Sequence, residues 1–196
     1  EISGFRDAML DMCLKTEFEN DHSIDIVGTG GDGKDTFNIS TLACFIVAGA
    51  GINVTKHGNY GVSSLSGSSN VLEAIGYTFT NEKSVLQKQL DKAGICFLHA
   101  PLFHPAMEKV ASIRKELAVR TFFNLLGPLV NPCFPKYRLL GVCSMEMLRL
   151  YNYLLQDVSA DYRIVHSLDG HYEVSLTADF KLVSKMGVER FKTKLP

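Results

Sequence analysis

Hydrophobic and polar positions follow two different periods along the chain, and the changes of period divide it into predicted strands and helices. Short apolar runs bounded by polar or glycine residues predict strands at residues 23–27, 52–58, 95–100, 137–143, 162–167 and 172–177. Apolar residues spaced three and four apart predict helices at residues 5–15, 40–51, 68–76, 82–94, 104–117 and 145–157. This alternation is typical of an α/β fold with a mainly parallel central sheet flanked by helices.

Small residues mark where several predicted helices begin and end. We expect Ser40 or Thr41 to cap the start of the helix at 40–51 and Gly51 to cap its end. A serine is expected to cap the helix at 68–76, and Gly94 to end the helix at 82–94. These residues therefore set where the predicted helices begin and end.

Composition and charge narrow the function classes. The chain has 196 residues, of which 46% are hydrophobic and 21% charged, as in a globular protein with a full core. A formal net charge of −1 argues against a surface built for nucleic-acid backbones. The five cysteines form no C-x-x-C pair or cluster with histidine, so we expect reduced, buried thiols in a cytoplasmic protein rather than a zinc site.

The two ends indicate a piece of a longer protein. The first residue is Glu1 rather than Met, and the last segment, "ERFKTKLP", shows no clear end of a domain. No basic segment followed by an apolar one opens the chain, so we predict no signal peptide. The longest apolar run, residues 41–54, is too short and too rich in glycine to span a bilayer.

A glycine-rich loop follows the first predicted strand and matches two phosphate-binding patterns. Residues 28–33 fit G-x-G-x-x-G, and with Lys34 they fit the start of a P-loop, but Asp35 stands where a hydroxyl should hold Mg²⁺. The dinucleotide reading fails too, because the helix cannot start before about Asn38. Moreover, the second strand ends near the cationic Lys56 instead of an acidic residue that would bind a ribose. The loop is thus either a different anion cradle or a structural loop.

Two polar loops favour the anion cradle. In the first loop, successive backbone N–H groups and a helix start can converge on an anion, and Asp32 could orient a hydroxyl or a metal-bound water. Its side-chain donors are Thr36, Asn38, Ser40 and Thr41. The second loop, residues 56–70, again follows a strand and precedes a helix. Because neighbouring parallel strands end at one edge, the two loops should face one crevice and could surround a ligand with several phosphates.

With both loops read, the chain resembles the anthranilate phosphoribosyltransferase family. The matching motifs are G-T-G-G-D-G-K-D-T-F-N-I-S-T (28–41), K-H-G-N (56–59), V-S-S-x-S-G-S (62–68), V-L-E-A-I-G (71–76), F-H-P-A-M (103–107) and R-T-F-F-N-L-L-G-P-L-V-N-P (120–132). They occur in the right order over about 110 residues. The resemblance covers the chain from about residue 4 to about residue 182.

The resemblance implies an architecture and an activity. It implies a remnant of a small all-helical domain at residues 1–20, an α/β core at 21–100, a further helical-domain segment at 101–130, and the continued core at 131–196, without the family's C-terminal part. It implies Mg²⁺-dependent transfer of the phosphoribosyl group of phosphoribosyl pyrophosphate (PRPP) to the amine of anthranilate, a step of tryptophan synthesis. It also implies a homodimer, with no membrane or nucleic-acid partner.

The family's site residues carry over motif by motif. The implied PRPP-binding residues are Gly28, Gly31, Asp32, Thr36, Asn38, Ser40, Thr41, Lys56, His57, Gly58, Asn59, Ser63, Ser64 and Ser68. The implied anthranilate-binding residues are Asn59, His104 and Arg114, and the implied metal-binding residues are Ser40 and Glu173. Neither loop offers a clear general acid or base, so we expect catalysis by charge stabilisation around the departing pyrophosphate and by positioning of the amine.

Three residues depart from the family pattern. Tyr172 stands where the family has the Asp of an adjacent Asp-Glu metal motif, and a phenol is a poor Mg²⁺ ligand beside a carboxylate. We therefore expect one metal site to be weakened, with Asp169 as a badly spaced substitute. Tyr60 and Leu65 stand where basic residues are frequent, so we expect looser pyrophosphate binding.

Two other functions remain open from sequence. The first is a homologue of the same fold that is catalytically impaired or that binds nucleic acid instead. The near-neutral charge and the intact K-H-G-N and N-I-S-T motifs argue against nucleic-acid binding. A pyrimidine nucleoside phosphorylase also attacks an anomeric carbon, but the segment at 124–132 after the H-P-A-M motif fits the transferase better.

Overall fold

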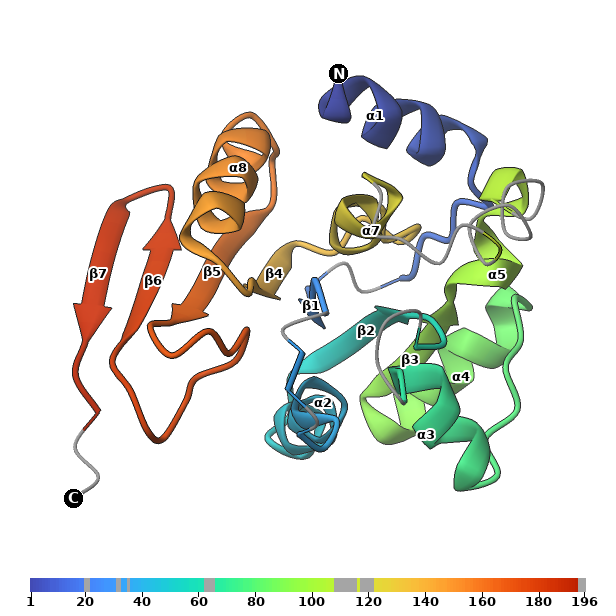
Figure 1. Ribbon diagram of the computed structural model, residues 1–196. Coiled ribbons are helices and arrows are strands. Elements are labelled where there is room, and N and C mark those ends of the chain that lie inside the picture. Colours follow the sequence, from blue (N-terminus) through green and yellow to red (C-terminus); the bar gives the residue numbers. More distant parts are fainter. Residues whose placement is uncertain are drawn as a thin grey trace.

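A single seven-stranded sheet forms the centre of the molecule (Figure 1). The computed structural model describes residues 1–19, 22–30, 33–34, 36–61, 66–107, 116 and 122–193. The strands lie in the order β3-β2-β1-β4-β5-β6-β7. They are β1 (Ser23–Gly28), β2 (Asn53–Gly58), β3 (Ile95–His99), β4 (Tyr137–Gly141), β5 (Asp161–Ser167), β6 (Phe180–Ser184) and β7 (Gly187–Phe191). The first five are parallel, and β6 and β7 are antiparallel, which confirms a mainly parallel α/β sheet.

Helices cover both faces of the sheet. The longer ones are α1 (Ile2–Met12), α2 (Ile39–Gly49), α4 (Lys83–Ala93) and α8 (Met145–Leu155). The shorter ones are α3 (Ser68–Ala74), α5 (Ala100–Phe103), α7 (Phe123–Leu126) and the 3-10 turn η1 (Gly127–Leu129). In Figure 1, α8 and α7 lie on one side of the strands and α2 on the other. Among the described residues, no helix combines the length and hydrophobicity needed to cross a bilayer.

The alternation of side chains along β3 shows how the two faces are built. Ile95 and Phe97 pack with α2 and α3 residues, whereas Cys96 and Leu98 pack with α4 and α5 residues. All five residues of β3 are buried, as expected for a parallel strand covered on both faces. The five cysteines carry free thiols; Cys13, Cys44 and Cys96 are buried as expected, whereas Cys133 and Cys143 are half-buried.

The carboxyl ends of the parallel strands come together at one edge. Gly28 at the end of β1 pairs with Gly141 at the end of β4, and Gly58 at the end of β2 pairs with His99 at the end of β3. The strand order reverses at β1, which has β2 on one side and β4 on the other. A sheet of this kind binds its ligands outside the carboxyl ends at such a switch point.

The last part of the sheet was predicted wrongly. Residues 172–177 form bends instead of a strand, and the sheet continues with the antiparallel pair β6 and β7, which the sequence reading missed. The hydroxyls of Ser175 and Thr177 donate to Asp169 Oδ2 at 2.6 Å and 2.7 Å. Because such local side-chain bonds compete with a strand ladder, the apolar alternation at 172–177 was a misleading signal.

Helix ends also differ from prediction. Asn38, not Ser40 or Thr41, is the N-cap of α2. Gly51 ends the helix as predicted, in the left-handed conformation directly after the C-cap Ala50. Gly67 rather than a serine precedes α3. Gly94 ends α4 in the left-handed conformation, as predicted. Most of the helix predicted at 104–117 lies outside the described residues. The division of the chain into four domain segments stays a prediction.

Candidate functional site

The two predicted loops meet at the carboxyl edge of the sheet. The first runs from the end of β1 to Asn38 at the start of α2, and the second follows β2 and ends at α3. Asn38 Nδ2 donates to the carbonyl of Ser66 in the second loop at 3.2 Å. Lys56 Nζ lies 3.4 Å from Ser40 Oγ at the start of α2. The expectation of two loops facing one region is therefore confirmed for their described residues.

Lys56 is a buried residue of β2, and its side chain does not point into solvent. Its side chain crosses from β2 to β1, where Nζ donates to the carbonyl of Ile26 at 2.6 Å, and only 2% of the residue is exposed. The ammonium is thus anchored at the end of β1 beside the Ser40 hydroxyl. The charge therefore lies in a water-poor environment, where electrostatic interactions are stronger than in bulk water.

Two histidines form a buried pair beside the second loop. The rings of His57 and His104 meet edge-on with their centroids 5.2 Å apart. His57 Nδ1 lies 3.2 Å from the carbonyl of Gly127, and both Nε2 atoms are buried with no hydrogen-bond partner among the described residues. Burial, with His104 close by, lowers the pKa of His57 to about 3, and burial also lowers the pKa of His104. Both rings are therefore neutral near pH 7, so they offer hydrogen bonds rather than charge.

The second loop is fastened to α3 by tight contacts. A Cβ added at Gly58 would lie 2.3 Å from Ser68 Oγ, so the Ser68 side chain packs directly on this glycine. The carbonyl of Asn59 accepts hydrogen bonds from Ser69 N at 3.2 Å and from Ser68 Oγ at 3.5 Å. Asn59 itself is exposed at the edge of the sheet. The K-H-G-N segment thus presents the exposed side chain of Asn59 on a backbone that α3 holds in place.

Tyr60, one of the departures from the family pattern, joins the same anchor. Its hydroxyl donates to Glu73 Oε1 at 2.5 Å, and its ring meets His99 edge-on at 4.9 Å. Burial contributes to a raised pKa of Tyr60, but the bond to Glu73 is its main cause. Tyrosine here supplies no cation; it ties the loop to α3 and β3.

A third segment reaches the same edge from beyond β5. The ring of Tyr172 covers Gly28, where an added Cβ would meet it at 2.5 Å, and the Tyr172 carbonyl lies over Gly141. Both carboxylate oxygens of the next residue, Glu173, are shielded from solvent, and its carbonyl accepts from Ser167 Oγ at 2.5 Å. Tyr172 therefore lies at the ends of β1 and β4, beside the first loop, and Glu173 is held at the end of β5.

Asp169 is engaged in holding this third segment. Some desolvation opposes its ionisation, but hydrogen bonds from Ser175, Thr177 and the backbone of His171 lower the pKa of Asp169 to about 2. Its Oδ2 atom already accepts two hydroxyl hydrogen bonds. The expectation that Asp169 could replace a missing metal ligand gains no support from this geometry.

Several predicted site residues cannot be placed. Gly31, Asp32, Ser63, Ser64 and Arg114, together with the departure at Leu65, lie outside the described residues. Of the others, Thr36 is exposed, Asn38, Ser40 and Ser68 are half-buried, and Thr41 is buried. The oxygen donors Ser40 and Glu173 have the chemistry that Mg²⁺ prefers. No group of three histidine, cysteine or acidic side chains that could hold a metal occurs among the described residues.

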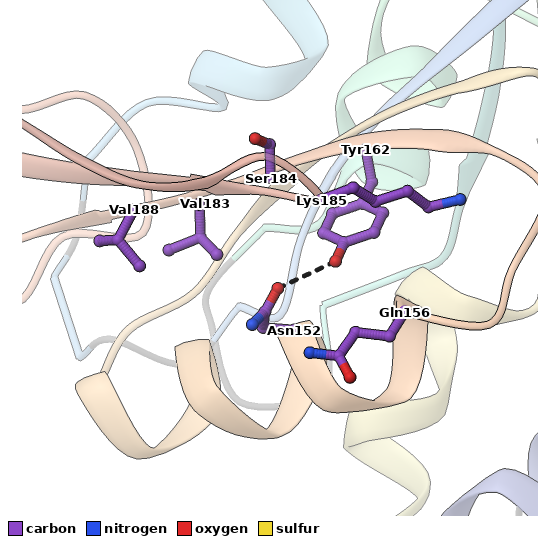
Figure 2. A pocket seen from close by; sticks show the side chains of 8 residues that line it. Asn152, Gln156, Tyr162, Val183, Ser184, Lys185 and Val188 are labelled. Atoms are coloured by element: carbon purple, nitrogen blue, oxygen red, sulfur yellow. Dashed lines mark hydrogen bonds between the residues drawn. The ribbon is translucent and has the colours of Figure 1, made fainter.

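A cavity of about 350 Å³ lies elsewhere, between α8 and the turn that joins β6 to β7 (Figure 2). Figure 2 shows Tyr162 and Asn152 in its wall, joined by a hydrogen bond of 2.9 Å. Lys185 also lines it, but its ammonium donates to the carbonyl of Val158. The predicted loops are not part of this cavity, so its size does not make it the functional site.

Comparisons with known proteins agree with the site. Residues 20–193 match the sequence profile of a family described as "Glycosyl transferase family, a/b domain". Anthranilate phosphoribosyltransferases from Cytophaga hutchinsonii and Bacteroides fragilis are 60% and 56% identical to this chain, over 94% and 98% of its length. These alignments cover 56% and 58% of the relatives, so the chain spans just over half of their length.

Solved structures show the same likeness. The crystal structure of anthranilate phosphoribosyltransferase from Thermus thermophilus superposes with a TM-score of 0.88 at 38% identity, covering 97% of this chain and 58% of the other. The Saccharomyces cerevisiae enzyme in complex with PRPP and Mg superposes with a TM-score of 0.89 at 32% identity, covering 97% and 54%. The chain therefore belongs to the glycosyl transferase family that this a/b domain defines, and its loop motifs resemble those of anthranilate phosphoribosyltransferases because it is related to them.

Proposed function

We propose that this chain carries the PRPP-binding part of an anthranilate phosphoribosyltransferase, which transfers the phosphoribosyl group of PRPP to the amine of anthranilate and releases pyrophosphate. One observation carries the proposal. The first and second loops, which hold the family's motifs, are joined at the switch point of the sheet by Asn38–Ser66 and by Lys56–Ser40. The yeast relative of the same fold is described in complex with PRPP and Mg.

The first loop and α2 would hold the pyrophosphate. The start of α2 presents the positive end of the helix dipole beside the Ser40 and Thr41 hydroxyls. Lys56 adds a positive charge from below. As the bond between the anomeric carbon and the pyrophosphate breaks, negative charge grows on the leaving oxygen. Donors that are already in place stabilise this charge without reorganising.

The second loop would position anthranilate. Asn59 is exposed at the sheet edge, and the His57–His104 pair lies behind it with two neutral rings. Neutral rings offer polar atoms beside the amine without adding a second positive charge. An aromatic amine needs little help from a base, so positioning supplies most of what this half of the site contributes.

Magnesium fits the residues at the edge. Ser40 contributes a hydroxyl, and Glu173 contributes a carboxylate that is shielded from solvent. Mg²⁺ is commonly held by one or two protein oxygens together with substrate phosphates, so an incomplete protein cage suits it. When bound, the ion would neutralise charge on the pyrophosphate. Tyr172 provides a phenol where the family has a carboxylate, which leaves Glu173 as the acidic residue of that pair.

Titration calorimetry with the full-length protein tests the proposal. PRPP should bind in the presence of Mg²⁺ and lose most of its affinity when the metal is removed with a chelator. Thymidine with phosphate serves as the control for the phosphorylase alternative and should show neither binding nor phosphorolysis. Binding of thymidine without binding of PRPP would contradict the proposal.

A second candidate, an impaired homologue that binds PRPP but turns over slowly, is favoured by one observation. The ring of Tyr172 covers Gly28 at the end of β1, which is part of the first loop's entrance. An aromatic ring at this position both removes a metal ligand and fills space beside the loop. Intact PRPP binding with very slow product formation would support this candidate.

We also propose a homodimer in the cytoplasm for the full-length protein, as the resemblance implies. Light scattering after size-exclusion chromatography tests the dimer, and a monomeric mass at micromolar concentration would contradict it.

A further inference from the structure

Strands β1 and β2 separate several residues before the two loops begin. Within these two strands, backbone pairing is confined to Ser23–Asn53 and Ile24–Val54, whereas β1 and β4 pair along five positions. Beyond Val54, side chains span the opening instead of backbone hydrogen bonds. One of them is Lys56, which reaches the carbonyl of Ile26.

Asp25 is the second side chain in this opening. It lies on β1, is 1% exposed, and accepts a hydrogen bond from the backbone N–H of His57 on β2 at 3.2 Å. The carboxylate thus takes the place that a backbone carbonyl would hold in a continued ladder. Through this carboxylate, β1 holds the backbone of His57, the second residue of the K-H-G-N motif.

Asn131 closes the opening from the other side. It follows η1, is fully buried, and its Nδ2 donates to Asp25 Oδ2 and to the carbonyl of Thr55, both at 2.9 Å. Its own Oδ1 accepts from Cys133 N at 3.1 Å. One amide therefore joins the segment after η1 to both β1 and β2.

Joining the two strands does not by itself require a buried carboxylate. Two residues earlier on the same strand, Ser23 Oγ and Thr55 Oγ1 form a buried hydrogen bond of 2.9 Å between β1 and β2 without any charge. Burying a carboxylate is costly unless cations and hydrogen bonds offset it. Lys56 on β2 and Arg138 on β4, both buried, flank Asp25 and supply part of that compensation, although burial still raises the pKa of Asp25. Within β1 and β2, this charged arrangement lies on the loop side of the last backbone pair, Ile24–Val54.

We propose that the Asp25–Asn131 pair is a positioning device for the PRPP site, because it sets how far the ends of β1 and β2 stand apart. This inference rests on the proposed function. The pair touches no substrate; it acts through β2, because it holds the backbone of Thr55 and His57 on either side of Lys56. Sequence reasoning missed both residues, since neither lies in a polar loop.

Binding and kinetics of Asp25→Asn in the full-length protein test the inference, with Ser23→Ala as the matched control. Both variants remove one buried interaction between β1 and β2, so both should lower the urea midpoint of unfolding. Asp25→Asn should also weaken Mg²⁺-dependent PRPP binding about tenfold, because a hydrogen bond to a charged group is lost. Its KM for PRPP should rise by the same factor, with KM for anthranilate within about twofold. Ser23→Ala should leave both within about twofold.

The outcomes separate this inference from the function beneath it. A wild-type protein that does not bind PRPP would overturn the proposed function and this inference with it. Wild-type binding, with PRPP affinity in Asp25→Asn equal to that in Ser23→Ala, would overturn the inference alone. If Asp25→Asn does not fold, Asn131→Ser decides, because it removes both amide donations and keeps the carboxylate. Unchanged PRPP affinity in folded Asn131→Ser would reject the positioning role.

Discussion

Stability should fall in mild acid because of His57. Burial beside His104 lowers the pKa of His57 from its ordinary 6.5 to about 3. Between these two values the unfolded chain takes up a proton on His57 that the folded chain cannot, so the folded state loses stability as pH falls and holds it fully above the ordinary value. Integrating this difference from about pH 7 to about pH 5 gives a loss of about 2 kcal/mol from this one residue.

Urea unfolding followed by far-UV circular dichroism measures this loss, since the chain contains no tryptophan for fluorescence. His57→Gln cannot titrate, so its stability should fall by about 2 kcal/mol less than that of the wild type over the same pH range. Ser23→Ala is the control: losing its buried hydrogen bond should cost about 1 kcal/mol at every pH and leave the slope unchanged. Parallel pH profiles for the wild type and His57→Gln would refute the buried, neutral imidazole.

Three substitutions test individual parts of the site. Lys56→Ala should weaken PRPP binding by about a hundredfold, because a buried cation is lost, and should change anthranilate binding far less; calorimetry with each substrate checks this, and equal losses would count against the loop assignment. Tyr172→Asp should lower the Mg²⁺ concentration that gives half-maximal activity, and an unchanged requirement would reject the reading of this position as a lost metal ligand. Tyr60→Phe removes only the bond to Glu73 and should cost about 1 kcal/mol of stability in urea unfolding; a stability equal to that of the wild type would show that this contact does not anchor the loop.

The parallel half of the fold was accessible from sequence because its signals are local. Each strand from β1 to β5 is a short apolar run, and the glycine loops that follow β1 and β2 place two polar segments at one edge. The start of α2 near Asn38, which excluded a dinucleotide fold, is seen in the structure. The hairpin of β6 and β7 escaped because all residues of β7 are exposed and give no apolar alternation.

The arrangement beneath the loops could not be predicted for a different reason. Whether Lys56 projects toward solvent or crosses to Ile26 depends on how far β1 and β2 diverge, which no local pattern encodes. The contact of Asp25 with Asn131 joins residues 106 positions apart. A buried aspartate inside an apolar strand was the available signal, and it became meaningful only with its partners in view.

Product formation tests the central claim most directly. The fluorescence of anthranilate should decrease with time when the full-length protein is mixed with PRPP and Mg²⁺, and it should stay constant when either is omitted. This loss should be slower in Lys56→Ala. Constant fluorescence at high protein concentration, with both PRPP and Mg²⁺ present, would contradict the proposed transferase.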